Sequence, residues 1–267
     1  MEKFRGSKHH DNLAQWSGED TGHRITLKGR MKYLKVDFKL SFFLTLMFIV
    51  MTVLGTLTHE LGHYSVAKFL GYEASINYQS TSHRDNDLNK YLHETYKKYS
   101  NEIKNNLDFP GKVTYLKTVK EYQADNFWII LGGPLQTMMT GTLALILLLV
   151  YRNNFVKNDK VHIVGWILIF LTLFWLRQVI NLFMALMTYL IKGQPSLRGD
   201  EMRLANHLDI NIWSIQILTG ISGLFILVPV INLLPKKMVL TFLISGLAGG
   251  ILGYYLWLVK FGQYIIL

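Results

Sequence analysis

Long apolar stretches alternate with shorter polar ones along this chain. A helix needs about 20 mostly apolar residues to cross the roughly 30 Å of hydrocarbon in a bilayer. Stretches of sufficient length and apolar character lie at residues 38–58, 127–151, 161–191, 212–234 and 238–259. The pattern therefore predicts an all-α, multi-pass integral membrane protein with about five transmembrane helices.

The polar stretches divide the chain further. Residues 1–37 are polar and basic without periodicity, which is typical of an N-terminal tail. Residues 38–267 form the predicted transmembrane domain, and within it residues 72–125 are a polar insert that we expect to be mostly helical. Apolar and small positions of the insert recur at helical spacings of three and four, namely Leu88, Leu92, Thr95, Tyr99 and Ile103. A turn at Pro110-Gly111 precedes a second helical stretch that leads into the next membrane segment.

The composition is typical of a membrane protein and favours some classes of binding partner over others. Half of the residues are apolar and only 17% are charged, which is unusual for a soluble domain. The first apolar run is too long for a cleavable signal peptide. A net charge of +10 favours anionic lipid headgroups over nucleic acid, because the lysines are dispersed and no nucleic-acid-binding motif is present. There is no cysteine, so any zinc ligand must be His, Asp or Glu.

The candidate chemistry lies at the end of the first apolar stretch, in His59-Glu60-Leu61-Gly62-His63. Two histidines four residues apart on a helix project from one face and can hold a single Zn²⁺. Glu60 can take a proton from a water at the open position of the metal. Such polar groups are costly near hydrocarbon unless they are paired or metal-bound. We expect the helix to continue to about Leu70 and to stop at Gly71.

Other polar or small residues fall inside the later apolar stretches. The second stretch is expected to start its helix near Gly133-Pro134, and Gly133, Thr137 and Gly141 form a small-residue stripe. Helix packing explains this stripe, and free backbone groups for a substrate strand are an equal alternative. In the third stretch, Arg177 and Asn181 share a face. A buried arginine must have a partner, and we favour a role at the site over a purely structural one.

A third metal ligand is expected after the third stretch, where Asp200 and Glu201 are both candidates. The chain leaves the membrane after the His-Glu motif and crosses it twice before Asp200. This topology places residues 59–63, Gly133-Pro134 and Asp200 on the same side of the bilayer. His207 follows on a short polar helix and is interpreted as a surface residue.

These elements together resemble the site-2 protease family of intramembrane zinc metalloproteases. The resemblance rests on the His59–His63 motif in a membrane helix, on Gly133-Pro134, and on Asn181 followed by Gly199-Asp200. It covers residues 38 to about 205. Thr137 stands where the family usually has an asparagine after Gly-Pro, and Gly199-Asp200-Glu201 replaces its Leu-Asp-Gly.

The resemblance implies a metalloendopeptidase that cleaves peptide bonds in or beside membrane-spanning protein substrates. It implies one zinc per chain, held by His59, His63 and Asp200, with Glu60 as the general acid–base. A substrate helix would have to unwind locally before cleavage. Substrate binding or support of the transition state would come from Gly133, Pro134, Thr137, Arg177 and Asn181.

Three other interpretations fit the same residues. A catalytically idle relative could use this fold to bind membrane helices, although Glu60 has no use in a purely structural zinc site. A zinc transporter would explain the polar face of Arg177 and Asn181. A metalloprotease similar to the prenyl-protein proteases would use Glu201 as the third ligand.

The sequence does not assign the side of the membrane. The resemblance implies a site that faces the cytosol, whereas the Lys and Arg residues of the loops favour, by a small margin, a cytoplasmic tail. The last apolar stretch carries the four-spaced pairs Gly246/Gly250 and Gly249/Gly253, which predict helix packing or contacts in an oligomer.

Overall fold

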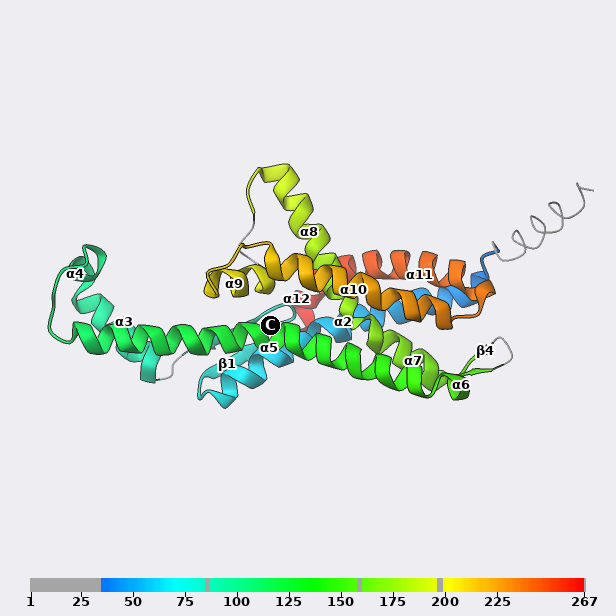
Figure 1. Ribbon diagram of the computed structural model, residues 1–267, viewed down its shortest axis with the longest axis horizontal. Helices are drawn as coiled ribbons and strands as arrows, with labels where there is room; N and C mark the ends of the chain where they lie inside the picture. The colour runs from blue at the N-terminus through cyan, green and yellow to red at the C-terminus, as the bar shows by residue number, and fades with distance from the viewer. Residues whose placement is uncertain (1–34, 85–86, 158–159, 196–198, 267) are drawn as a thin grey trace, which may run out of the picture.

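The computed structural model describes residues 35–84, 87–157, 160–195 and 199–266. Its helices dominate, and five of them are long and apolar enough to cross a membrane (Figure 1). These spans are Phe38–Phe69, Lys112–Val150, Ile163–Lys192, Ser214–Leu233 and Lys236–Ile265. The predicted all-α membrane fold is confirmed. Of the predicted tail, only residues 35–37 lie within the described part of the chain.

Helix α2 (Phe38–Phe69) carries the His-Glu motif and has well-formed ends. Asp37 caps its N-terminus, where the side chain accepts a hydrogen bond from the Leu40 amide at 3.1 Å. At the other end Gly71 has a φ of +85°. The backbone amide of Gly71 donates to the Lys68 carbonyl oxygen, and the amide of Tyr72 donates to the Ala67 carbonyl oxygen. These two hydrogen bonds form a Schellman motif. The predicted stop at Gly71 is confirmed.

The polar insert begins with a hairpin that the sequence did not predict. Strands β1 (Glu73–Ile76) and β2 (Thr81–Arg84) pair antiparallel directly after α2. The helical part of the insert follows as α3 (Asp87–Lys98) and α4 (Ser100–Lys104). Helix α3 packs on the first part of the long helix α5. Together with α4 they form an arm that extends from one end of the molecule (Figure 1).

Helix α5 (Lys112–Val150) is one continuous helix that joins the insert to the second span. Gly133 and Pro134 therefore lie inside a helix, and the prediction that they begin one is wrong. The segment before them contains no helix breaker, so the helix that starts in the insert continues into the span. Pro134 lacks an amide hydrogen and leaves one backbone carbonyl of the preceding turn without its helical donor.

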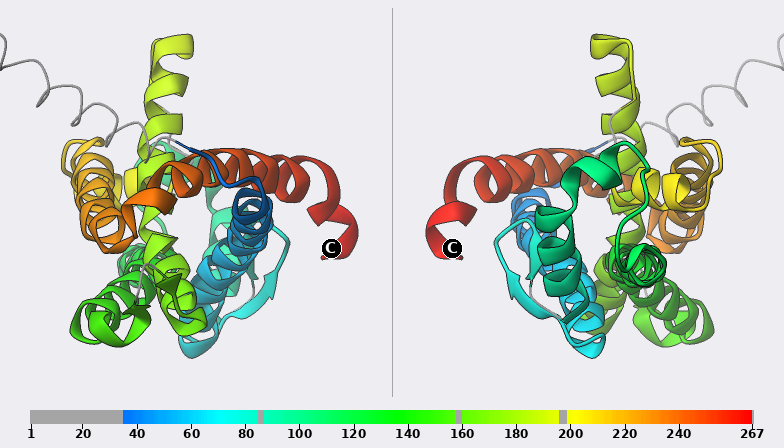
Figure 2. Two further views of the ribbon diagram at one scale, coloured as in Figure 1. Left: turned by 90° about the vertical axis from the view of Figure 1, so that its right-hand side faces the viewer. Right: turned by 90° about the vertical axis from the view of Figure 1, so that its left-hand side faces the viewer.

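The third span, predicted as one helix over residues 161–191, is bent. It follows the short helix α6 (Arg152–Phe155) and a second small hairpin, β3 (Val156–Lys157) and β4 (Lys160–Val161). Helix α7 (Ile163–Thr172) then tightens into the 3₁₀ turn η1 (Leu173–Trp175) before α8 (Leu176–Lys192). Figures 1 and 2 show α8 projecting from the bundle.

The last elements are α9 (Asp200–His207), α10 (Ser214–Leu233), α11 (Lys236–Tyr254), the π-helical turn η2 (Tyr255–Phe261) and α12 (Gly262–Ile265). Helix α11 lies along α2 (Figure 2). A Cβ on Gly249 or Gly253 would collide with α2, whereas one on Gly250 would meet nothing within 4 Å. The glycines of α11 thus serve packing within the chain, and the predicted contact in an oligomer stays a prediction.

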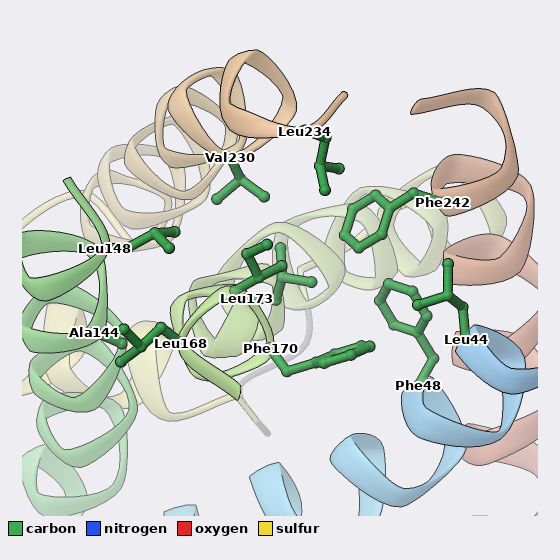
Figure 3. Packing of buried hydrophobic residues seen from close by; sticks show 11 residues of the cluster. Leu44, Phe48, Ala144, Leu148, Leu168, Phe170, Leu173, Val230, Leu234 and Phe242 are labelled. Atoms are coloured by element: carbon green, nitrogen blue, oxygen red, sulfur yellow. The ribbon is translucent and has the colours of Figure 1, made fainter. Parts of the chain in front are cut away.

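The apolar core gathers at one end of the bundle, around the first part of α2 (Figure 3). Phe48 packs edge-on against Phe170 with ring centroids 5.0 Å apart, and Phe242 lies 5.3 Å from it. Leu148 and Val230 complete the cluster from α5 and α10.

Candidate metal centre

The last third of α2 presents three buried titratable side chains. His59, Glu60 and His63 are each less than a tenth exposed. The helical spacing of four places the two imidazoles on one face, edge to face, with their Nε2 atoms 3.2 Å apart. A ligating atom of each of the three residues lies within 4.8 Å of the other two. Among the described residues, these three side chains are therefore close enough together to hold a metal ion.

Small residues let α5 cross α2 at this level. A Cβ on Gly62 would collide with the carbonyl oxygen of Gly132, and a Cβ on Gly132 with that of Gly62. One residue further, a Cβ on Gly133 would overlap the Nε2 atoms of both imidazoles. The glycines therefore keep free the space into which the two histidines point.

Helix α5 also orients His63. The Nδ1 atom of His63 lies 2.7 Å from the carbonyl oxygen of Ile129, so Nδ1 carries the hydrogen and donates it. The Nε2 atom is then the one with a free lone pair. A backbone carbonyl that fixes the tautomer in this way is a common partner of metal-binding histidines.

Asp200 reaches the imidazoles from the first turn of α9. Its Oδ2 atom lies 3.0 Å from Nε2 of His59 and 3.3 Å from Nε2 of His63. The other oxygen, Oδ1, lies 3.9 Å from the guanidinium of Arg203. Burial alone would raise the pKa of Asp200, but the close contacts with the two imidazoles and their charge together outweigh burial and hold the pKa well below its usual range.

The Glu60 carboxylate lies within 4.8 Å of the two imidazoles and has polar partners of its own. The hydroxyl of Thr81 in β2 lies 3.1 Å from Oε2 of Glu60 and 2.9 Å from its backbone carbonyl oxygen, and can donate to either. On the other side, a guanidinium nitrogen of Arg177 lies 3.9 Å from Oε1. Residues from two separate elements thus hold the carboxylate in place.

Glu201, the alternative ligand, faces a different helix. It is fully buried, and the amide nitrogen of Asn181 in α8 donates to its carboxylate at 3.3 Å and 3.4 Å. Burial raises the pKa of Glu201, and the charge of the adjacent Asp200 adds to that rise. The structure therefore places Asp200, and not Glu201, at the two histidines.

A cavity of about 460 Å³ opens beside these groups. One wall contains Glu60, His63 and Asp200, and the hairpin contributes Thr81 and His83. A stripe of α8 completes it with Arg177, Asn181, Met184, Ala185 and Thr188. The cavity is large enough for a short stretch of extended peptide and joins polar groups to apolar side chains.

Two sequence-predicted residues lie away from this cavity. Pro134 lines a separate, smaller apolar pocket. The hydroxyl of Thr137 donates to the Pro134 carbonyl oxygen at 2.9 Å and is buried within its own helix. In this arrangement neither residue faces a substrate in the cavity. His207, interpreted as a surface residue, lies beside the Asn126 side chain at 3.2 Å.

Residues that the sequence analysis missed come mainly from the hairpin. Thr81 contacts Glu60, and His83 lines the cavity, where burial and the charge of Arg203 lower its pKa. Gln216 of α10 is buried beside the cavity as well. No motif spacing marks any of them. The signal that could have found Gln216 is its position as an amide inside an apolar run.

The three donor atoms have the spacing that zinc requires. A tetrahedral site with bonds of about 2.0–2.1 Å separates its ligand atoms by roughly 3.3 Å. The Nε2 atoms of His59 and His63 and Oδ2 of Asp200 are separated by 3.0, 3.2 and 3.3 Å. The lack of a side chain at Gly133, next to both Nε2 atoms, and the absence of cysteine in the chain also suit a site built from histidine and carboxylate. These residues therefore fit a zinc ion.

Comparisons of this chain with family models, with curated proteins and with solved structures found no match.

Proposed function

We propose that this protein is an intramembrane zinc metallopeptidase that hydrolyses peptide bonds in or near membrane-spanning protein substrates, as the resemblance to the site-2 protease family implies. The observation that carries the proposal is the triangle of two Nε2 atoms and Oδ2 of Asp200 with edges of 3.0–3.3 Å. A buried carboxylate, Glu60, lies next to it. Glu60 and the two histidines lie in a helix long and apolar enough to cross a membrane.

His59, His63 and Asp200 would hold one zinc ion per chain. When bound, the ion would lower the pKa of a water molecule and polarise the scissile carbonyl. Glu60 accepts the proton of the attacking water on a carboxylate oxygen and returns it to the leaving amine. Thr81 and Arg177 keep that carboxylate turned toward the cavity.

The cavity sets the form in which a substrate enters. A helix with its side chains is about 10–12 Å across, and its carbonyl groups are engaged in its own hydrogen bonds. A cavity of about 460 Å³ accepts a few residues of extended chain more readily than an intact helix. Substrate helices should therefore unwind locally at the cleaved bond.

The proposal is tested with purified protein, casein as an unfolded general substrate, and the Glu60→Gln variant as the matched control. Both proteins are first shown to hold one zinc ion per chain. We expect the variant to lose about 10²–10⁴-fold in cleavage rate while it keeps its zinc. The same pair is expressed in cells, and new protein N-termini inside or next to transmembrane segments are compared.

Each alternative function gives its own result in these assays. Equal peptide patterns for wild type and Glu60→Gln in both assays, with zinc bound, would favour an idle helix-binding protein and overturn the proposal. Zinc flux into proteoliposomes without cleavage would favour a transporter. Labelling of a single cysteine introduced at Asp37, from either side of the membrane, assigns the side of that end of α2.

A further inference from the structure

The first turn of α9 contains two carboxylates that face different helices. Asp200 approaches the imidazoles of α2, and Glu201 contacts Asn181 of α8. Glu201 is fully buried, and both of its oxygens lie within reach of the same amide nitrogen. A buried carboxylate is stable only when it is hydrogen-bonded, so this contact is a necessary part of the packing of α9.

Consecutive residues of an α-helix point about 100° apart around its axis. Fixing the direction of Glu201 therefore also fixes the direction of Asp200. Helix α9 spans only Asp200–His207, and a helix of this length is only marginally stable in isolation. Its rotation must be set by tertiary contacts, and the Asn181 contact lies one residue from the proposed metal ligand.

The same feature explains why Asn181 lines the cavity without being free for a ligand. Its Nδ2 atom is turned toward Glu201 at 3.3–3.4 Å. Arg177, one turn earlier on α8, faces Glu60. Helix α8 thus contacts the proposed base Glu60 directly through Arg177. It also contacts Glu201, the neighbour of the proposed ligand Asp200, through Asn181.

We propose that Asn181 and Glu201 are a positioning pair that sets the rotation of α9 and so aims the Asp200 carboxylate at His59 and His63. The proposal rests on the proposed zinc site. According to this proposal, Glu201 acts by positioning Asp200 and is not itself a metal ligand. Outer partners of this kind are typically worth 10–100-fold in metal affinity.

The test measures the zinc dissociation constant of the metal-free protein by competition with a chromophoric chelator, and the midpoint of thermal unfolding without zinc. Asn181→Ala removes the donor, and we expect its dissociation constant to rise about tenfold or more. Asn126→Ala is the matched control, because it removes the amide beside His207 at the far end of α9. The control should bind zinc as wild type does.

Two further variants separate positioning from ligation. Glu201→Gln keeps an oxygen acceptor for Asn181, so it should bind zinc within about threefold of wild type. If Glu201 were itself a ligand, this variant would lose zinc as severely as Asp200→Asn. The exchange Asn181→Asp with Glu201→Gln reverses donor and acceptor, and it should restore most of the affinity that Asn181→Asp alone loses.

The outcomes distinguish this proposal from the proposed function. A wild type that binds no zinc, or an Asp200→Asn variant that binds it equally well, would overturn the metal site and the positioning pair together. Normal zinc binding by Asn181→Ala would overturn only the positioning pair, as would a loss that the exchanged pair does not recover. A lower unfolding midpoint with unchanged zinc affinity would show that the contact is merely structural.

Discussion

The two halves of helix α2 differ in what holds them. Its first half lies in an apolar core, where Phe48 packs against Phe170 of α7 and Phe242 of α11 in a cluster to which α5 and α10 also contribute. Its second half lies among glycines, histidines and carboxylates that make specific contacts with α5, α8, α9 and the β1–β2 hairpin. One helix therefore joins a region held by packing to a region held by directed polar contacts.

The two halves of α2 should therefore differ in how well they tolerate substitutions. Apolar packing accepts exchanges of similar volume, whereas buried polar groups lose their function when a contact is displaced by even 1 Å. The core end should therefore set stability with little influence on zinc affinity. The site end should set zinc affinity and cleavage with little influence on stability.

Of the variants that compare the two halves of α2, the largest effect is expected for Gly133→Ala. The added methyl group would overlap the Nε2 atoms of both histidines, and the rings can swing aside only by leaving the site. We expect zinc affinity to fall about 100-fold, measured by chelator competition. Gly250→Ala, where a Cβ meets nothing within 4 Å, is the control. Equal zinc affinity in the two variants would contradict the geometry of the site.

At the core end, Phe48→Ala should lower the free energy of unfolding by about 2 kcal/mol. This value is below that for a Phe→Ala exchange in the core of a soluble protein. Lipid is as apolar as the core, so little transfer free energy is lost, and the cost comes mainly from the cavity that the missing ring leaves. Unfolding in mixed micelles measures it, and the zinc affinity of the folded variant should stay unchanged. A parallel loss of zinc affinity would mean that the two halves of α2 are coupled.

A smaller effect is expected for Thr81→Val. The exchange keeps the shape of the side chain but removes the hydroxyl that lies beside Glu60. We expect the cleavage rate to fall about tenfold, as for the loss of one hydrogen bond to a charged group, with zinc affinity unchanged. Thr81→Ser should retain most of the rate. If Thr81→Val cleaves like wild type, the hairpin does not position the base.

The smallest effect is expected for Trp257→Phe. The indole nitrogen of Trp257 in η2 donates to the Tyr78 carbonyl oxygen at 2.9 Å, in the loop between β1 and β2. Without that bond, amide exchange in the hairpin should rise about fivefold, because a typical hydrogen bond contributes a net of roughly 1 kcal/mol. Hydrogen-exchange mass spectrometry measures it. Unchanged protection would show that η2 does not hold the hairpin.

The helical framework was predictable because its signals are local. A span is marked by the length of its apolar run, and the stop after α2 by Gly71, whose positive φ suits glycine. The same locality explains the errors. The β1–β2 sequence lacks the β-branched and aromatic alternation that marks strands, and the bend at Leu173–Trp175 contains neither Gly nor Pro.

The candidate site was predictable in part. The spacing of His59 and His63 and the topology of the spans together led to Asp200 and Glu201 as candidates for the third ligand. The choice between Asp200 and Glu201 could not be made, since adjacent residues differ only in their direction around a helix, which tertiary packing decides. Thr81 was not found because it enters through a hairpin whose pairing depends on residues outside any motif.

X-ray absorption at the zinc edge, on wild type and on Asp200→Asn, tests the central claim most directly. The account predicts one zinc per chain in wild type with two imidazoles and oxygen neighbours at about 2.0–2.1 Å, and weaker, altered coordination in the variant. Zinc with fewer than two imidazoles, or an identical spectrum and affinity in Asp200→Asn, would contradict it.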